Sequence, residues 1–199
     1  MSKAISYLFH PVLMPLIGLF IILNSEAYIA VMDIRVTRML YMIVGIFTLL
    51  LPLALFFLFL YIGYIHSVQM NDRKQRIIPY FISFIMYYIA YYLVKKLAVS
   101  SFISAFLFAA ALTLLIIVIV TYFWKISTHM TGVGGLTGLV LSLSFVYNAD
   151  TMYFLVIVLL VSGLLASARL SLNAHRPGEI CAGFALGLIT VFAICSLYP

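Results

Sequence analysis

Residues 151–197 read TMYFLVIVLLVSGLLASARLSLNAHRPGEICAGFALGLITVFAICSL, two long apolar runs separated by a short polar linker. Each run approaches the roughly 20 residues that an α-helix needs to cross a bilayer. The linker contains Arg169, His175, Arg176 and Glu179. The stretch therefore predicts two membrane-spanning helices, joined by a linker whose ionisable residues need an explanation.

The whole chain has the composition of a membrane protein. Hydrophobic residues make up 66% of its 199 residues and charged residues 8%, against roughly 25% charged residues in soluble domains. The apolar runs are continuous, which favours helices over the alternating strands of a β-barrel. We therefore expect an all-α, polytopic transmembrane helical bundle that forms one domain over residues 1–199.

Seven apolar segments predict about six to seven spans. They are residues 5–24, 38–66, 79–97, 102–124, 132–148, 151–169 and 178–197. The first lacks a convincing small-residue cleavage site and is interpreted as a span rather than a signal peptide. The second exceeds the thickness of a bilayer, so it must tilt, kink at Pro52 or extend past the membrane.

The net charge of +6 does not indicate nucleic-acid binding, because no soluble basic domain carries it. Most basic residues end apolar runs, where they would meet lipid headgroups or an anionic substrate. Cys181 and Cys195 are both interpreted as buried apolar residues. On one helix they would lie about 21 Å apart, too far for a disulfide.

With seven spans, three polar linkers fall on one side of the membrane, together with the N-terminus. They are QMNDRKQRIIP (69–79), KISTHMTG (125–132) and RLSLNAHRPGE (169–179). The opposite loops carry charges typical of a membrane edge: Glu26, Asp33, Arg35, Arg38, Lys95, Lys96 and Asp150. We therefore expect the three linkers to converge on one site.

The third linker has the strongest pattern. His175 and Glu179 are four residues apart and share a helix face, where a carboxylate fixes the imidazole tautomer and supports its positive charge. Arg169 can offer a planar set of donors to a tetrahedral anion. The alternative is a polar pair at the membrane boundary without a catalytic role.

The second linker places Ser127 and His129 before a glycine-rich stretch. Its glycines allow backbone N–H groups to approach an anion, or simply let helices pack closely; they are Gly132, Gly134, Gly135 and Gly138. The first linker contains three basic residues, Arg73, Lys74 and Arg76. They either bind an anion or simply form a basic loop of the kind that lies on the cytoplasmic side of a membrane.

Two histidines, several cations, one serine and one carboxylate together indicate phosphoryl transfer through a phosphohistidine. One histidine would attack phosphorus, the other would protonate the leaving oxygen, and the cations would hold the phosphate oxygens. This chemistry requires no metal and no cofactor. The hypothesis fails if His129 and His175 lie on opposite sides of the membrane.

The three linkers resemble the signature motifs K-x6-R-P, P-S-G-H and S-R-x5-H-x3-D of the phosphatidic acid phosphatase type 2 superfamily, lipid phosphatases related to the vanadium haloperoxidases. The third motif keeps its spacing through Arg169, His175 and Glu179, with Ala168 for serine and glutamate for aspartate. The second keeps Ser127 and His129, with isoleucine for proline and threonine for glycine.

The first motif matches loosely, because two isoleucines separate Arg76 from Pro79 and its lysine corresponds to Lys74 or Arg73. The resemblance spans roughly residues 72–183 and excludes the first two helices, and a family-like core would cover about 72–199.

The resemblance implies a role for each matched residue. His175 would be the nucleophile, Glu179 its orienting carboxylate and His129 the general acid. The phosphate would be bound by a further group of side chains: Arg169, Arg76, Lys74, Arg73 and Ser127.

The implied substrate is a lipid phosphate or an isoprenyl phosphate or diphosphate in the bilayer. Without the site residues, the positive charges favour the opposite loops as cytoplasmic, so we expect a bacterial inner membrane protein whose site faces the periplasm or exterior. The alternative is a catalytically degenerate lipid-binding or transport protein of the same fold. The sequence leaves open whether the chain forms a homo-oligomer.

Overall fold

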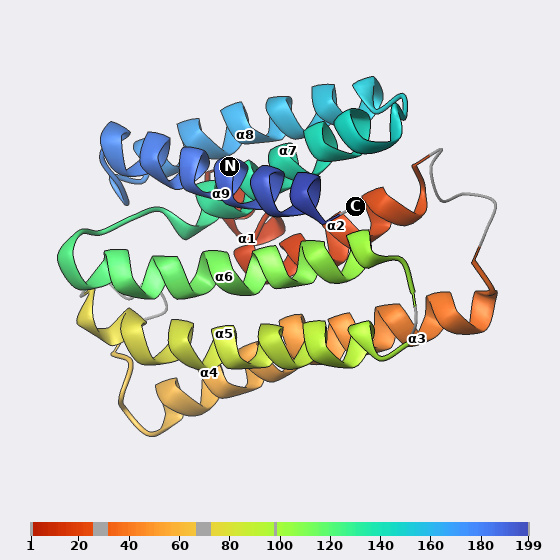
Figure 1. The fold of residues 1–199 in the computed structure, drawn as a ribbon. Helices are drawn as coiled ribbons and strands as arrows, with labels where there is room; N and C mark the ends of the chain where they lie inside the picture. The colour runs from red at the N-terminus through yellow and green to blue at the C-terminus, as the bar shows by residue number, and fades with distance from the viewer. Residues whose placement is uncertain (1, 26–31, 67–72, 98, 199) are drawn as a thin grey trace.

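The computed structural model of the chain describes residues 2–25, 32–66, 73–97 and 99–198, and its regular elements there are all helices (Figure 1). They are α1 (Ser2–Leu8), the 3-10 helix η1 (Pro11–Leu13), α2 (Met14–Leu23), α3 (Ile34–Val44), the π-helix η2 (Gly45–Leu50), α4 (Leu51–Tyr61), α5 (Lys74–Lys95), α6 (Ser101–Phe123), α7 (Thr128–Tyr147), α8 (Met152–Ser171) and α9 (Pro177–Leu197). Glu26 and residues 69–72 of the first polar linker lie outside the described residues.

The seven predicted spans are confirmed within this part of the chain. Two of them are composite, Ser2–Leu23 and Ile34–Tyr61, and the other five are α5 to α9. Each is long and apolar enough to cross a membrane. The chain is therefore an integral membrane protein with an all-α fold.

The second span changes helix type ahead of Pro52, at the place where a kink was expected. Proline lacks the N–H that would donate to the carbonyl four residues earlier, that of Thr48. The hydroxyl of Tyr87 on α5 donates to this carbonyl instead, at 3.2 Å. The π-turn of η2 is thus accommodated by a neighbouring helix, and α4 packs against α5.

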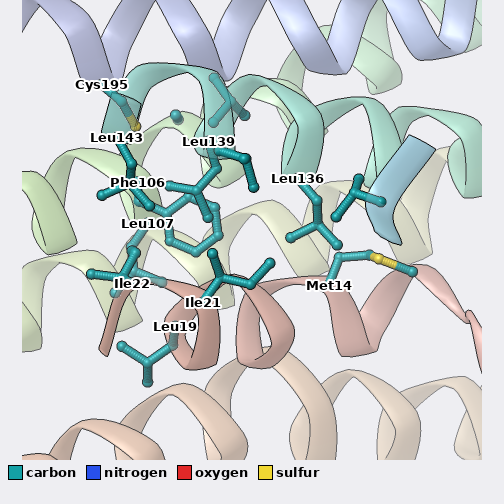
Figure 2. Packing of buried hydrophobic residues seen from close by; sticks show 14 of the residues in the cluster. Met14, Leu19, Ile21, Ile22, Phe106, Leu107, Leu136, Leu139, Leu143 and Cys195 are labelled. Carbon is teal, nitrogen blue, oxygen red and sulfur yellow. The ribbon is translucent and has the colours of Figure 1, made fainter. Parts of the chain in front are cut away.

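The core lies where α2 packs against α7, α6 and α3, and Gly18 of α2 faces both Phe106 of α6 and Leu139 of α7. Figure 2 shows this packing: Phe106 of α6 and Leu139 of α7 lie on one side of α2, Leu19 of α2 points to its other side, and all three are buried. Cys195 on α9 is also buried in this core, as expected. The prediction for Cys181 was wrong: its side chain is exposed, because it lies on the outer face of α9.

Helices α7 and α9 form the closest pair in the bundle, and glycines make this possible. A Cβ at Gly138 would lie 2.5 Å from the carbonyl oxygen of Leu188, and one at Gly183 would lie 2.6 Å from the carbonyl oxygen of Ser127. No larger residue fits at this distance without a backbone shift. The glycine-rich stretch therefore serves helix packing, which brings the start of α7 against the start of α9.

Candidate active site

A cavity of about 1010 Å³ opens among the helices and reaches the polar linkers. Its basic lining residues come from seven places in the chain: Lys3 on α1, His10 before η1, Arg76 on α5, Lys125 between α6 and α7, His129 on α7, Arg169 on α8 and His175 between α8 and α9. The structure thus brings the three predicted linkers together, and it places the two predicted histidines on the same cavity.

His175 is held by Glu179 in the way that their spacing predicted. Nδ1 of His175 lies 2.7 Å from Oε2 of Glu179, and both side chains are buried. A carboxylate oxygen accepts, so the proton of the neutral ring is on Nδ1 and the lone pair is on Nε2. His175 lines the cavity whereas Glu179 does not, so the carboxylate orients the ring from behind.

The backbone at the start of α9 fixes this pair. Pro177 occupies the first turn of the helix, where its missing N–H costs no hydrogen bond. The N–H of Arg176 donates to Oε2 of Glu179 at 3.3 Å, and the N–H of Ser127 donates to the carbonyl of Glu179 at 3.3 Å. The second contact joins the linker before α7 directly to the linker before α9.

Three cations surround His175. Arg169 in the last turn of α8, Arg76 in the first turn of α5 and Lys125 all act electrostatically on its ring. Nε of Arg169 is buried and has no hydrogen-bond partner within the described residues. A buried donor without a partner costs about 1–3 kcal/mol, so the position favours a bound anionic acceptor.

Lys125 is a site residue that the motifs did not single out. Its Nζ donates to the carbonyl of Ala174 at 3.0 Å, next to His175. Burial lowers the pKa of Lys125, as do the charges of Arg76 and Arg169, while Glu179 opposes them. The sequence feature that could have identified Lys125 is its position in the same linker as Ser127 and His129.

The surroundings keep His175 neutral. Burial lowers its pKa to about 4, and the three nearby cations act in the same direction, while the hydrogen bond to Glu179 opposes them. A neutral imidazole with a free lone pair is the form that can attack an electrophile.

His129 faces the same cavity from the first turn of α7, and its Nε2 lies 3.1 Å from the backbone carbonyl of Ser6. The charges of Arg169 and His175 both act on it, which is consistent with one shared site.

The other predicted residues lie around this site rather than on the cavity wall. Ser127 is fully buried, and its Oγ has no hydrogen-bond partner in the part of the chain that the structure describes. Arg73 donates through Nη1 to the carbonyl of Phe123 at the end of α6. Lys74 is exposed. Neither Arg73 nor Lys74 lines the cavity.

The rest of the cavity is mostly apolar and extends along α4, α5 and α6. Its walls include Phe56 of α4, Ile82 of α5, and Ala110 and Leu114 of α6. A charged end and a long apolar remainder together suit an amphiphilic molecule. Comparison with protein-family models, with curated proteins and with solved structures finds no match for this chain.

Proposed function

We propose that this integral membrane protein is a phosphatase that removes a phosphate from a lipid phosphate, or from an isoprenyl phosphate or diphosphate, through a phosphohistidine on His175. The observation that carries the proposal is the pair formed by His175 and Glu179, whose imidazole lines a cavity that also holds His129 and the three cations that act on His175. A carboxylate on Nδ1 leaves Nε2 as the nucleophilic nitrogen.

The reaction proceeds in two steps. Nε2 of His175 attacks phosphorus, and the bond from phosphorus to the lipid oxygen breaks while His129, protonated on both ring nitrogens, gives that oxygen a proton and becomes neutral. In the second step His129 takes a proton from water, the resulting hydroxide attacks the phosphohistidine, and the bond between nitrogen and phosphorus breaks. The products are the lipid alcohol, or the lipid monophosphate where the substrate is a diphosphate, and inorganic phosphate. His175 returns to its starting form.

The cations supply the electrostatic part of catalysis. A phosphoryl group spreads negative charge over its equatorial oxygens as it is transferred. The charges of Arg169, Arg76 and Lys125 act on one another and on His175, so all three can stabilise this charge. A guanidinium group can bind two oxygens at once, and the unpartnered Nε of Arg169 supports its role as a phosphate ligand.

The substrate class follows from the two ends of the cavity. Its charged end suits a phosphate headgroup, and its apolar length suits a hydrocarbon chain. We propose membership of the phosphatidic acid phosphatase type 2 superfamily on the motifs around Arg76, His129 and His175. We also propose a bacterial inner membrane location, with the site facing the periplasm or exterior.

The test is phosphate release by detergent-purified protein, in EDTA, from a panel of lipid and isoprenyl phosphates. Wild type should release phosphate, and the His175→Ala variant should not. Failure of both folded proteins on every substrate would contradict the proposal. Retained binding of the same lipids without release would favour a lipid-binding or transport function for this cavity.

A further inference from the structure

The N-terminal segment, residues 2–13, reaches the cavity although the motif resemblance does not include it. Its residues on the cavity wall are Lys3, Ser6, Tyr7, His10, Pro11, Val12 and Leu13. The segment is fixed against α8, where the hydroxyl of Ser171 donates to that of Ser2 at 2.8 Å. Arg169 lies two residues before Ser171 on α8, and its charge acts on His10.

The backbone of this segment determines the protonation of His129. Nε2 of His129 lies 3.1 Å from the carbonyl oxygen of Ser6. Because a carbonyl oxygen only accepts, Nε2 must be the donor and must carry a proton. The nitrogen of His129 that remains free to exchange a proton with a substrate is therefore Nδ1.

His10 is the second contact that the segment makes with His129. The two rings meet edge to face, with centroids 5.5 Å apart and an interplanar angle of 79°. The orientation of His10 is set locally, since the N–H of Val12 donates to its Nδ1 at 3.5 Å. Its other nitrogen then carries the proton of the neutral ring.

We propose that the N-terminal segment is a part of the active site, in which the Ser6 carbonyl and the His10 ring position His129 so that Nδ1 of its doubly protonated ring gives the proton to the leaving oxygen. His10 is in this view a positioning residue that acts through His129. The inference rests on the proposed phosphatase function. It goes beyond the motifs, which assign no role to residues before 72.

The first experiment compares variants of His10 on the lipid phosphate that wild type hydrolyses best. In His10→Asn the new side chain can still accept from the N–H of Val12, since asparagine is a good helix cap, but the imidazole is lost. We expect kcat to fall about 10- to 100-fold in both His10→Ala and His10→Asn, with little change in KM. His66→Ala is the matched control, because His66 is exposed and does not line the cavity.

A double-mutant cycle then tests the route of the effect. If His10 acts through His129, the His10→Ala change should cause no further loss of kcat in a His129→Ala background. Wild-type activity in His10→Asn would mean that His10 acts only as a helix cap, and this would overturn the proposal. Fully additive losses in the double variant would overturn it as well. The charge of Arg169 acts on both rings and that of His175 acts on His129, while Arg76 and Lys3 line the same cavity.

A second measurement separates this inference from the phosphatase proposal. Diethyl pyrocarbonate modifies accessible neutral histidines, and mass spectrometry reports each site with and without orthovanadate as a phosphate analogue. Protection of His10 together with His129 and His175, but not of His66, supports the shared site even when wild type releases no phosphate. Protection of His175 without His10 overturns the inference, and protection of none overturns both proposals.

Discussion

Nδ1 of His175 lies 2.7 Å from Oε2 of Glu179, and the carboxylate also accepts from the backbone N–H of Arg176. The carboxylate is therefore fixed before it orients the imidazole. This makes Glu179 a positioning group whose charge, and not only whose shape, matters when positive charge develops on His175.

The first prediction concerns that charge. Glu179→Gln retains an oxygen that can accept from Nδ1, but it removes the negative charge, so we expect kcat to fall by about 100-fold or more with little change in KM. Glu179→Asp keeps the charge but is one methylene shorter, so its kcat should lie between those of wild type and Glu179→Gln. Steady-state kinetics on one lipid phosphate would measure this, and equal activity of Glu179→Gln and wild type would contradict it.

The second prediction is a pH dependence of activity. His175 attacks only while Nε2 is unprotonated, and its pKa is lowered to about 4, chiefly by burial. Activity limited by this group should therefore persist as the pH falls from 7 to 5 and should be lost through about pH 4. The acid limb of the kcat/KM profile would measure it, because this profile reports the pKa values of the free enzyme, and a limb near pH 6.5 would contradict it.

The same shift predicts a pH dependence of stability. The folded pKa of about 4 lies below the ordinary value of 6.5, so the unfolded chain binds more protons between these values. The free energy of unfolding should therefore decrease as the pH falls from about 6.5 to about 4, and this contribution should level off below that. In His175→Asn the contribution should be absent, which chemical unfolding in detergent at several pH values would measure.

The sequence predicts some of these relationships and not others, for physical reasons. Bilayer thickness sets the length of apolar runs, so all seven spans could be identified from hydropathy alone. The pair of His175 and Glu179 depends on local helix geometry, which makes four-residue spacing sufficient.

The contributions of Lys125 and His10 depend on tertiary contacts instead. Lys125 donates to Ala174, which is 49 residues away, and no spacing rule connects the two. His10 meets His129 because η1 and α2, which follow His10, pack on α7. The sequence feature that could have identified His10 is that it is a polar side chain in an apolar span. It lies toward the side of the membrane on which the topology places the three linkers.

The third prediction concerns Lys125 as a phosphate ligand. A hydrogen bond to a charged group contributes about 1.5–3 kcal/mol, so Lys125→Met should raise KM for a lipid phosphate about 10- to 100-fold. Lys125→Arg should recover part of the loss. Lys96→Met is the control, because Lys96 is exposed beside the ring of Tyr92 and does not line the cavity. Equal effects of Lys125→Met and Lys96→Met would contradict a specific role.

The fourth prediction concerns the packing that joins the two histidine-bearing linkers. Gly183→Ala would place a Cβ 2.6 Å from the carbonyl oxygen of Ser127, which forces α7 and α9 apart and should destabilise the fold by about 1–3 kcal/mol. Gly163→Ala on α8 is the matched control, because nothing lies within 4 Å of the added Cβ. Alanine there should be neutral or should stabilise the helix by up to about 1 kcal/mol. Thermal unfolding of both variants in one detergent would compare them, and a stable Gly183→Ala variant would contradict the close approach.

The last prediction concerns the apolar part of the cavity, where Ala110 of α6 forms part of the wall. The bilayer is as apolar as this wall, so moving a hydrocarbon chain from the bilayer into the cavity gains little free energy from the hydrophobic effect. A larger side chain at this position should therefore act by steric exclusion of the chain. Ala110→Trp should block a long chain from lying in the cavity while its phosphorus is at His175, so kcat/KM for a long-chain lipid phosphate should fall at least about tenfold. Hydrolysis of a small, chainless phosphate monoester such as para-nitrophenyl phosphate should change less than about twofold, because it needs only the charged end of the cavity. A parallel loss on both substrates would mean that the substitution disturbs the site itself, and no loss on either would mean that the chain binds elsewhere.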